Sequence, residues 1–260
     1  MTIEIDIDGP VLRRMDEGGV VTLQLNRPRQ FNALSEALLT SLRQEFAEIA
    51  RDHSVRCVVL TGAGRAFCAG HDLKEMRAEP SQDYYTALFS QCSDLMIAIS
   101  SVPVPVIARV HGVATAAGCQ LVAACDLAIA SQSARFAVSG INLGLFCSTP
   151  SVALSRNVSA KRAFDMLVTG RFIDAPTACD WGLINEIARD DALDAVVAEK
   201  VAQILSKSPA AIRYGKEMFN RQRQMPLVDA YAYAADVMAR NMMEEETCAG
   251  IDAFLGKPSN

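Results

Sequence analysis

No two cysteines of this 260-residue sequence stand at the C-x-x-C spacing, although it contains eight cysteines. That spacing is typical of structural zinc sites and redox motifs, so its absence argues against both. The three histidines show no metal-ligand spacing either, and we predict no metal site. Cys57, Cys92, Cys119, Cys125 and Cys179 lie inside apolar segments, where a free cysteine behaves as a small hydrophobic residue. We therefore expect buried, reduced thiols.

The sequence also lacks an apolar run of about 20 residues, the length that a membrane-spanning helix needs. Its first segment, MTIEIDIDGP, has no basic region in front of an apolar stretch, so we expect no signal peptide. The net charge of −5 argues against a broadly basic surface for nucleic acid. These features predict a cytoplasmic protein with neither a membrane nor a nucleic-acid partner.

Apolar residues are plentiful, since 50% of the chain is hydrophobic and only 21% is charged, which suffices for a full core. In the first half, short β-branched runs alternate with helical periodicity. The runs predict strands at residues 20–25, 57–61, 104–110, 126–130 and 135–138, and the periodicity predicts helices at 35–52, 84–100 and 119–125. Strands that alternate with helices pair in parallel through crossover connections, so we predict an α/β fold.

From Ser159 onward the pattern is helical. Helices are predicted at residues 159–168, 175–181, 191–206, from 209 onward, and 227–246. Ser159 and Asp174 are expected to cap helices, and Gly170 to end one. The helix at 227–246 carries more Met and Tyr than a solvated helix needs, so it either packs on the core or forms a subunit interface.

Residues 105–126, PVIARVHGVATAAGCQLVAACD, are predicted to form a strand, a tight turn and a helix. The first N–H groups of a helix have no partner within it and carry a partial positive charge, so this turn could hold an oxyanion. Ala116, Ala117 and Gly118 have almost no side chain, which would let a ligand reach the backbone. Alternatively, the small residues only allow the helix to pack closely on the strand.

Three further segments accompany this one: NRPRQFNAL at 26–34, RAFCAGHDLKEM at 65–76 and LVTGRFIDAPTACDWGLINEI at 167–187. Together the four segments resemble the crotonase superfamily, also called the enoyl-CoA hydratase/isomerase family. The resemblance implies a crotonase-like spiral of ββα units with a CoA-thioester site, here residues 1–203. It also implies a helical oligomerisation region, here 204–260, and a homotrimer or dimer of trimers. The only cofactor implied is the coenzyme A of the substrate.

In this family two backbone N–H groups bind the thioester oxygen and stabilise an enolate. Matched onto this chain, they belong to His71, which follows Ala69 and Gly70, and to Ala117, which precedes Gly118. The resemblance implies a backbone role for His71, although a histidine side chain can also do acid–base work near neutral pH.

The resemblance also suggests contacts with coenzyme A. Arg29 matches a basic position near the CoA phosphates, and Ala33 matches a backbone contact to the nucleotide. Phe254 and Lys257 match C-terminal residues that reach the adenine, often from a neighbouring subunit.

Three residues after His71 belong to the same predicted site. Asp72 is expected to cap or anchor the helix that starts near Leu73, and Lys74 either meets a CoA phosphate or is simply solvated.

Two positions depart from the family pattern. Hydration of a 2-enoyl-CoA, the family's nominal activity in fatty-acid metabolism, needs a base and an acid, and two glutamates supply them in its hydratases. Here those positions hold Gln120, which cannot exchange a proton near pH 7, and Gly140. Two hypotheses remain: an enzyme that works on an acyl-CoA or enoyl-CoA through a stabilised enolate, and a non-catalytic acyl-CoA-binding protein.

The segment GLFCSTP at 144–150 offers other chemistry. Ser148 falls where family dehalogenases place a nucleophilic Asp. Cys147, near a helix N-terminus, would have a lowered pKa and could act as a nucleophile. The alternative is that Ser148 or Thr149 caps the helix, with Pro150 in its first turn.

Overall fold

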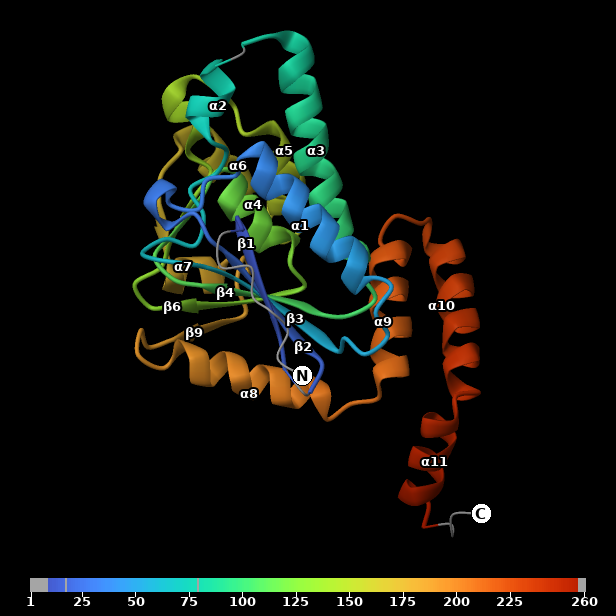
Figure 1. The fold of residues 1–260 in the computed structure, drawn as a ribbon. Coiled ribbons are helices and arrows are strands. Elements are labelled where there is room, and N and C mark those ends of the chain that lie inside the picture. Colours follow the sequence, from blue (N-terminus) through green and yellow to red (C-terminus); the bar gives the residue numbers. More distant parts are fainter. Residues whose placement is uncertain (1–8, 17, 79, 257–260) are drawn as a thin grey trace.

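The computed structural model describes residues 9–16, 18–78 and 80–256, and its main sheet runs through the molecule (Figure 1). Within these residues the sheet has the strand order β1-β2-β3-β4-β6-β9. The strands span Val11–Met15, Val20–Leu25, Cys57–Gly62, Val106–Val110, Leu127–Ser131 and Glu186–Ala188. β1 pairs antiparallel with β2, and every other neighbouring pair is parallel. The predicted α/β class is confirmed.

A second, smaller sheet is formed by β5 (Val113–Thr115), β7 (Arg135–Ala137) and β8 (Ile173–Asp174), in that order. Cys68 forms an isolated bridge with Ala114 of β5, and a second isolated bridge pairs Leu34 with His71. Segments far apart in the sequence are thereby held beside one another. The sequence did not predict β5, because three residues give no measurable periodicity.

Helices cover both faces of the main sheet (Figure 1). They are α1 (Glu36–Ile49), α3 (Gln82–Ser101) and α4 (Ala117–Ala124) on one side, and α8 (Leu193–Leu205) on the other. Because side chains alternate along a strand, β2 contributes to both cores: Val21 and Leu23 pack with α1 and α3, and Val20 packs with α8.

Some of the helices begin or end at the capping residues and glycines expected from the sequence. The Leu38 N–H donates to Ser35 Oγ at 3.2 Å, which caps α1. The Thr177 N–H donates to Asp174 Oδ1 at 2.9 Å, so the predicted Asp174 cap forms. Gly170 ends its helix in a left-handed conformation, with φ 61°. Ser159 precedes that helix but accepts no capping hydrogen bond, so this expected cap is wrong. The shorter helices are α2 (Leu73–Ala78), α5 (Ser148–Leu154), α6 (Ala160–Thr169) and α7 (Ala175–Asp180).

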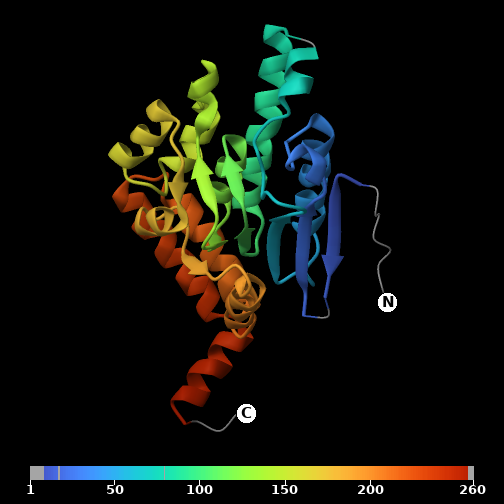
Figure 2. The same ribbon diagram turned by 90° about the vertical axis from the view of Figure 1, so that its left-hand side faces the viewer.

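The C-terminal part contains α9 (Pro209–Gln222), α10 (Leu227–Met242) and α11 (Glu245–Phe254), and α11 projects away from the rest of the chain (Figure 2). The single helix predicted at 227–246 is wrong. Glu244 is extended and accepts a hydrogen bond from the Tyr214 hydroxyl at 2.9 Å, and the acidic residues that follow it suit the start of a new helix.

A buried cation, Lys216, is one of the side chains that anchor α9 to the rest of the fold. Lys216 Nζ donates to the carbonyls of Ile99 at 3.1 Å and Val104 at 2.8 Å, and to Asp126 Oδ2 at 2.6 Å. Burial raises the pKa of Asp126 and lowers that of Lys216, and their mutual attraction opposes both shifts. The predicted boundary between residues 203 and 204 falls inside α8.

Helix α10 packs little of its surface within the chain. Of its residues only Ala230 and Val237 are buried, whereas Leu227, Val228 and Tyr231 are largely exposed. The first alternative for this segment, packing on the core, therefore does not hold for most of its apolar side chains.

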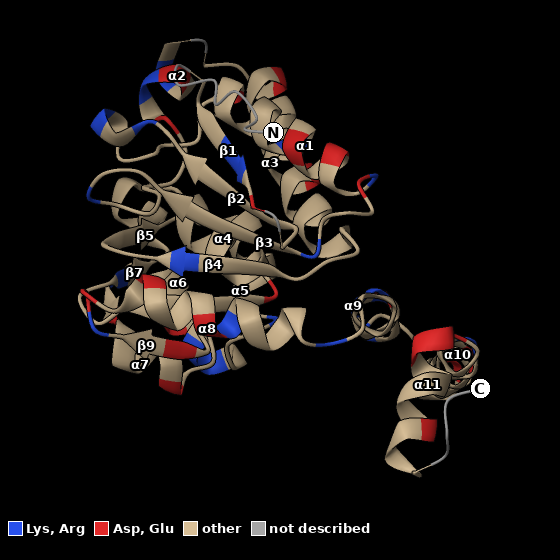
Figure 3. Cartoon of the chain, turned by 60° about the horizontal axis from the view of Figure 1, so that its bottom comes forward, with Lys and Arg blue, Asp and Glu red and all other residues tan. Residues whose placement is uncertain are grey.

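Among the residues that the structure describes, no helix is both long and apolar enough to cross a membrane, and no three His, Cys, Asp or Glu side chains gather to hold a metal ion. Basic and acidic residues are interspersed along the chain (Figure 3).

Candidate oxyanion site

Two loops meet where the resemblance places the oxyanion donors. The Cys68 N–H donates to the Val113 carbonyl at 3.1 Å, and the Thr115 N–H donates to the Cys68 carbonyl at 3.0 Å. This pairing brings Gly70, with φ +92°, against Ala116. A Cβ added to Gly70 would lie 2.9 Å from the Ala116 Cβ, so only glycine allows this approach.

The backbone at the start of α4 is strained. Ala116 has φ 51° and ψ −121°, a conformation that L-residues rarely adopt, and its N–H is held by the Ala137 carbonyl at 2.9 Å. The same hypothetical Gly70 Cβ lies 3.3 Å from the Ala117 nitrogen. Among the described residues, neither the His71 N–H nor the Ala117 N–H donates a hydrogen bond. Two free donors therefore stand on adjoining segments.

Gly118 explains how closely α4 can approach the loop. An added Cβ would lie 2.1 Å from the Cys68 carbonyl oxygen, which leaves no room for any side chain. Small residues at the start of α4 thus allow close packing, as the alternative interpretation held. They leave the Ala117 N–H free as well, so the two interpretations are compatible.

His71 and Gln120 place unpartnered polar atoms at this site. The imidazole packs edge-on to Phe89, with ring centroids 5.5 Å apart. Its two ring nitrogens and Gln120 Oε1 are buried and have no hydrogen-bond partner among the described residues. Burial lowers the pKa of His71 from 6.5 to about 4, and the backbone of Leu34 only partly opposes this shift. The imidazole is therefore neutral at pH 7.

Gly140 cannot simply be exchanged for a carboxylic acid. An added Cβ would lie 2.6 Å from the Leu145 carbonyl oxygen and 2.8 Å from Cys147 Sγ. The Gly140 N–H itself donates to Cys147 Sγ at 3.3 Å. A glutamate at position 140 would fit only if the 144–147 loop moved. The local packing therefore excludes the second carboxylate.

This packing predicts that Gly140→Ala lowers the free energy of unfolding by at least about 1 kcal/mol, because the methyl group overpacks the loop. Urea denaturation measures the change. Gly215→Ala is the matched control: nothing lies near its added Cβ inside α9, and replacing a helical glycine should stabilise. Equal stability of Gly140→Ala and the wild-type protein would contradict the packing argument.

Cys147 is not an activated thiol. Burial raises its pKa, and the Gly140 N–H only partly offsets this effect, so the predicted lowering is wrong. The expected capping by Ser148 or Thr149 is also wrong, because Cys147 occupies the cap position, its side chain accepts no capping hydrogen bond from α5, and Ser148 begins α5. Ser148 Oγ is 3.4 Å from the Phe146 carbonyl. Pro150 lies in the first turn, as expected.

Asp72 anchors the loop after His71. Its carboxylate accepts Arg27 Nη2–H at 2.9 Å and the Lys74 N–H at 3.1 Å, so it holds the start of α2 as expected. Burial raises the pKa of Asp72, but these hydrogen bonds more than offset that effect and lower it. Sequence analysis missed Arg27, which also donates to the Ala33 carbonyl at 2.6 Å.

Asn32, another residue that sequence analysis missed, organises the loop that carries Arg29. Its buried amide donates to the Ala63 and Ala66 carbonyls at 2.9 and 2.8 Å and accepts the Arg27 N–H. Ala33 is buried, whereas Arg29 is exposed.

The other residues predicted to contact coenzyme A do not form one cluster. Leu73 and Lys74 are exposed on α2, and Ala69 is half-buried. Phe254 is 90% exposed on α11, far from α4 (Figure 1). Lys257 lies outside the described residues.

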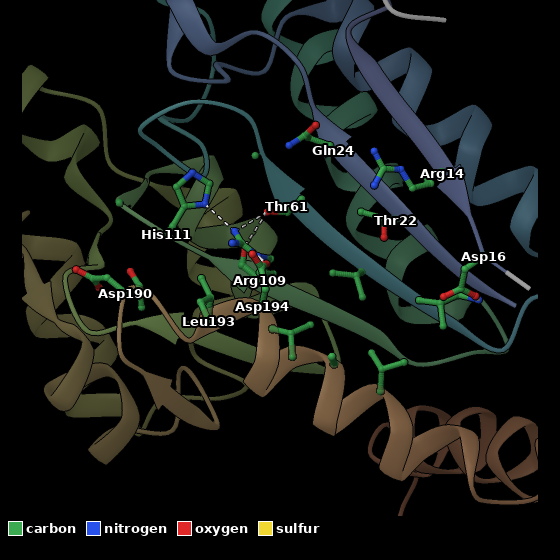
Figure 4. A pocket seen from close by; sticks show the side chains of 18 of the residues that line it. Arg14, Asp16, Thr22, Gln24, Thr61, Arg109, His111, Asp190, Leu193 and Asp194 are labelled. Atoms are coloured by element: carbon green, nitrogen blue, oxygen red, sulfur yellow. Dashed lines mark hydrogen bonds and ion pairs between the residues drawn. The ribbon is translucent and has the colours of Figure 1, made fainter. Parts of the chain in front are cut away.

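A groove of about 1120 Å³ lies elsewhere, between the main sheet and α8, and none of the predicted site residues lines it (Figure 4). There Arg109 contacts Asp194 at 2.6 Å and His111 Nδ1 at 3.3 Å, and His111 Nε2 lies 2.8 Å from the Gly64 carbonyl. These polar groups already satisfy one another.

A family model described as enoyl-CoA hydratase/isomerase matches residues 15–259. The chain belongs to the enoyl-CoA hydratase/isomerase family. Enoyl-CoA hydratase domain-containing protein 3, mitochondrial, of Xenopus laevis is 40% identical over 248 residues, which cover 95% of this chain and 84% of that protein. This confirms the resemblance drawn from the four segments.

Solved structures of other proteins with enoyl-CoA hydratase names share the fold. An enoyl-CoA hydratase from Mycobacterium smegmatis superposes with a TM-score of 0.95 at 57% identity, covering 97% of this chain and 99% of that chain. Human enoyl Coenzyme A hydratase domain-containing protein 3 gives 0.91 at 39% identity, covering 96% and 100%.

The prediction of a cytoplasmic protein is contradicted by the family relatives. Those from Xenopus laevis, rat and human, at 40 to 41% identity, are all named mitochondrial. The reasoning failed because a missing secretory signal separates secreted proteins from the rest and does not distinguish one intracellular compartment from another.

Proposed function

We propose that this family member binds a coenzyme A thioester with the thioester oxygen between the N–H groups of His71 and Ala117. The observation that carries the proposal is the close approach of Gly70 to Ala116 and Ala117, which puts two unpartnered donors on adjoining segments. The strain at Ala116 supports it, because such conformations cluster at functional sites.

Two fixed N–H donors would hold negative charge on the thioester oxygen and so stabilise an enolate. Preorganised donors of this kind contribute about 3–4 kcal/mol each to transition states in other enzymes. The donors belong to the backbone, and the pairing of Cys68 with β5 fixes their positions before any ligand binds.

Water addition does not belong to the proposal. Gln120 cannot exchange a proton, and Gly140 has no side chain and no room for one. The second candidate function, acyl-CoA binding without turnover, is favoured by the neutral His71 imidazole, since a histidine with a pKa of about 4 is a weak base.

We further propose that the exposed side chains of Arg29, between β2 and α1, and Lys74, at the start of α2, meet the CoA phosphates, and that Ala33 contacts the nucleotide. Phe254 would contact the adenine of a coenzyme A molecule bound to a neighbouring subunit, because α11, which carries Phe254, lies far from α4 of its own chain. The exposed apolar side chains of α10 and α11 support assembly into a homotrimer or a dimer of trimers.

The proposal predicts that butyryl-CoA raises the melting temperature of the purified protein more than free CoA does, because ligands that bind only the native state stabilise it. It also predicts no measurable hydration of crotonyl-CoA. Thermal unfolding and loss of the enoyl absorbance measure the two results. Equal shifts with CoA and butyryl-CoA would reject the thioester site, and rapid hydration would mean that another group supplies the proton.

A further inference from the structure

Strand β1 leaves one edge of the main sheet open. Within the described residues it lies at the end of the strand order and pairs only with β2. The Asn26 N–H donates to the Pro10 carbonyl at 2.8 Å, and the Asp16 N–H donates to the Val20 carbonyl at 3.1 Å. Because hydrogen-bonded positions alternate along an antiparallel pair, the even-numbered residues of β1 turn their backbone groups toward β2. The odd-numbered residues turn theirs toward the open edge; these are Val11, Arg13 and Met15.

The two faces of this edge suit different side chains on a partner strand. On one face Arg13 already binds Glu45 and Glu48 of α1, at 3.2 and 3.0 Å. Met15 on the same face packs against the core. Apolar side chains suit this face, because further carboxylates would be repelled there. On the other face Arg14 is exposed, and no described carboxylate pairs with it (Figure 4). An acidic side chain suits that face.

The sequence before β1 has this two-sided pattern. Residues 3–8, IEIDID, lie outside the described residues, and in them isoleucine alternates with an acidic residue. A period of two is typical of a strand with one apolar and one polar face, and isoleucine favours strands. Such a strand, added to the open edge, could present its isoleucines on the face of Arg13 and its carboxylates on the face of Arg14.

One antiparallel register satisfies both faces. In it Ile5 stands opposite Arg13, so their backbone groups can form hydrogen bonds. Glu4 then stands opposite Arg14, and opposite charges directly across two strands stabilise the pairing. A shift by one residue would put isoleucines on the face of Arg14 and carboxylates on the face of Glu45.

A tight hairpin within one chain does not bring this segment to the edge. The Pro10 and Gly9 carbonyls accept the backbone N–H and the side-chain amide of Asn26, at 2.8 and 3.1 Å, so the chain continues along β2 at this point. A three-residue hairpin over residues 8–10 needs a positive φ at its last position, which proline excludes. A two-residue turn needs the N–H that Pro10 lacks. A second copy supplies the segment without a turn.

We propose that residues 3–7 of a second copy of this chain add an antiparallel strand to β1, and that the two copies exchange these segments about a two-fold axis at Gly9. Gly9 lies midway between Ile5 and Arg13, so a single register serves both copies at once. Addition of a strand to an open sheet edge is a common mode of association. The contact does not depend on the thioester site.

Exchange of the charges across the Glu4–Arg14 pair tests the register. Glu4→Arg sets two cations opposite each other, twice in a two-fold contact, and should weaken association of the two copies by about tenfold or more. Arg14→Glu should do the same, and the double variant should associate like the wild-type protein. Glu199→Arg, on the exposed surface of α8, is the matched control and should change nothing. Sedimentation velocity over a range of protein concentrations measures the association.

Two neighbouring prolines test which way the backbone of the segment faces. Ile5→Pro removes an N–H that faces β1, whereas Asp6→Pro removes one that faces away, which edge strands tolerate. Ile5→Pro should weaken association by about tenfold or more, and Asp6→Pro should weaken it much less. Amide hydrogen exchange at residues 11–15 should be slow in the associated wild-type protein and fast in Ile5→Pro.

Unchanged association in Glu4→Arg or in Ile5→Pro overturns the proposal, as does a double charge variant that is not restored. Protection of residues 11–15 that Ile5→Pro removes without a change in mass would show that the segment binds its own chain, which also overturns the exchange. All these variants should bind butyryl-CoA like the wild-type protein, so a failure of the thioester site is seen separately.

Discussion

Replacing Ala117 with proline is expected to weaken butyryl-CoA binding by about 10- to 100-fold, because it removes one of the two donors and puts a methylene group in its place. The thioester oxygen would then face an apolar group in a buried site. Ala117 is the first residue of α4, a position at which helices generally tolerate proline. Calorimetric titration measures the loss of affinity.

Ala160→Pro is the matched control, since Ala160 is the first residue of α6 and lies outside the site. It should bind butyryl-CoA like the wild-type protein. Circular dichroism and urea denaturation show whether Ala117→Pro still folds, because the strained Ala116 precedes the substituted residue. A folded Ala117→Pro variant with unchanged affinity would show that the Ala117 N–H does not hold the thioester.

Acid is expected to destabilise the protein through His71. Burial lowers the pKa of this imidazole from 6.5 to about 4, so between these values the unfolded chain binds a proton that the folded chain does not. Stability is therefore complete above pH 6.5 and falls as the pH drops through this window. The loss amounts to about 3 kcal/mol by pH 4.

Urea denaturation of the wild-type protein and His71→Phe at pH 7.0 and at about pH 4 isolates this contribution. Phenylalanine keeps the backbone N–H and an aromatic ring against Phe89 but has no proton to gain. The variant should lose about 3 kcal/mol less than the wild-type protein. Some loss should remain, because burial lowers the pKa of His111 as well. Identical losses would mean that His71 is not buried as described.

The main strands and most helix starts could be predicted because their signals are local. Val20–Leu25 forms β2 as predicted, and Ser35 and Asp174 cap their helices, because β-branched runs and capping side chains act within a few residues. The break between α10 and α11 was missed, because it depends on Glu244 meeting Tyr214, thirty residues away in the sequence.

The candidate site could be predicted in outline and not in detail. The unpartnered N–H groups at a helix N-terminus pointed to Ala117, and the family resemblance pointed to His71. In the structure Gly70, the residue before His71, lies against Ala116 and Ala117. The partners that hold the loops, Arg27 and Asn32, gave no signal, because their hydrogen bonds reach residues that only the fold brings near. For the same reason, the raised pKa of Cys147 could not be foreseen from its place at a helix start.

The most direct test of the oxyanion site is the infrared carbonyl stretch of butyryl-CoA labelled with carbon-13 at the thioester carbon. Isotope-edited difference spectra would compare the thioester bound to the wild-type protein with the thioester in water. Two fixed N–H donors should polarise the carbonyl and shift its band to lower frequency, and Ala117→Pro should reduce that shift. A band at or above its frequency in water, in a protein that binds the ligand, would contradict the account.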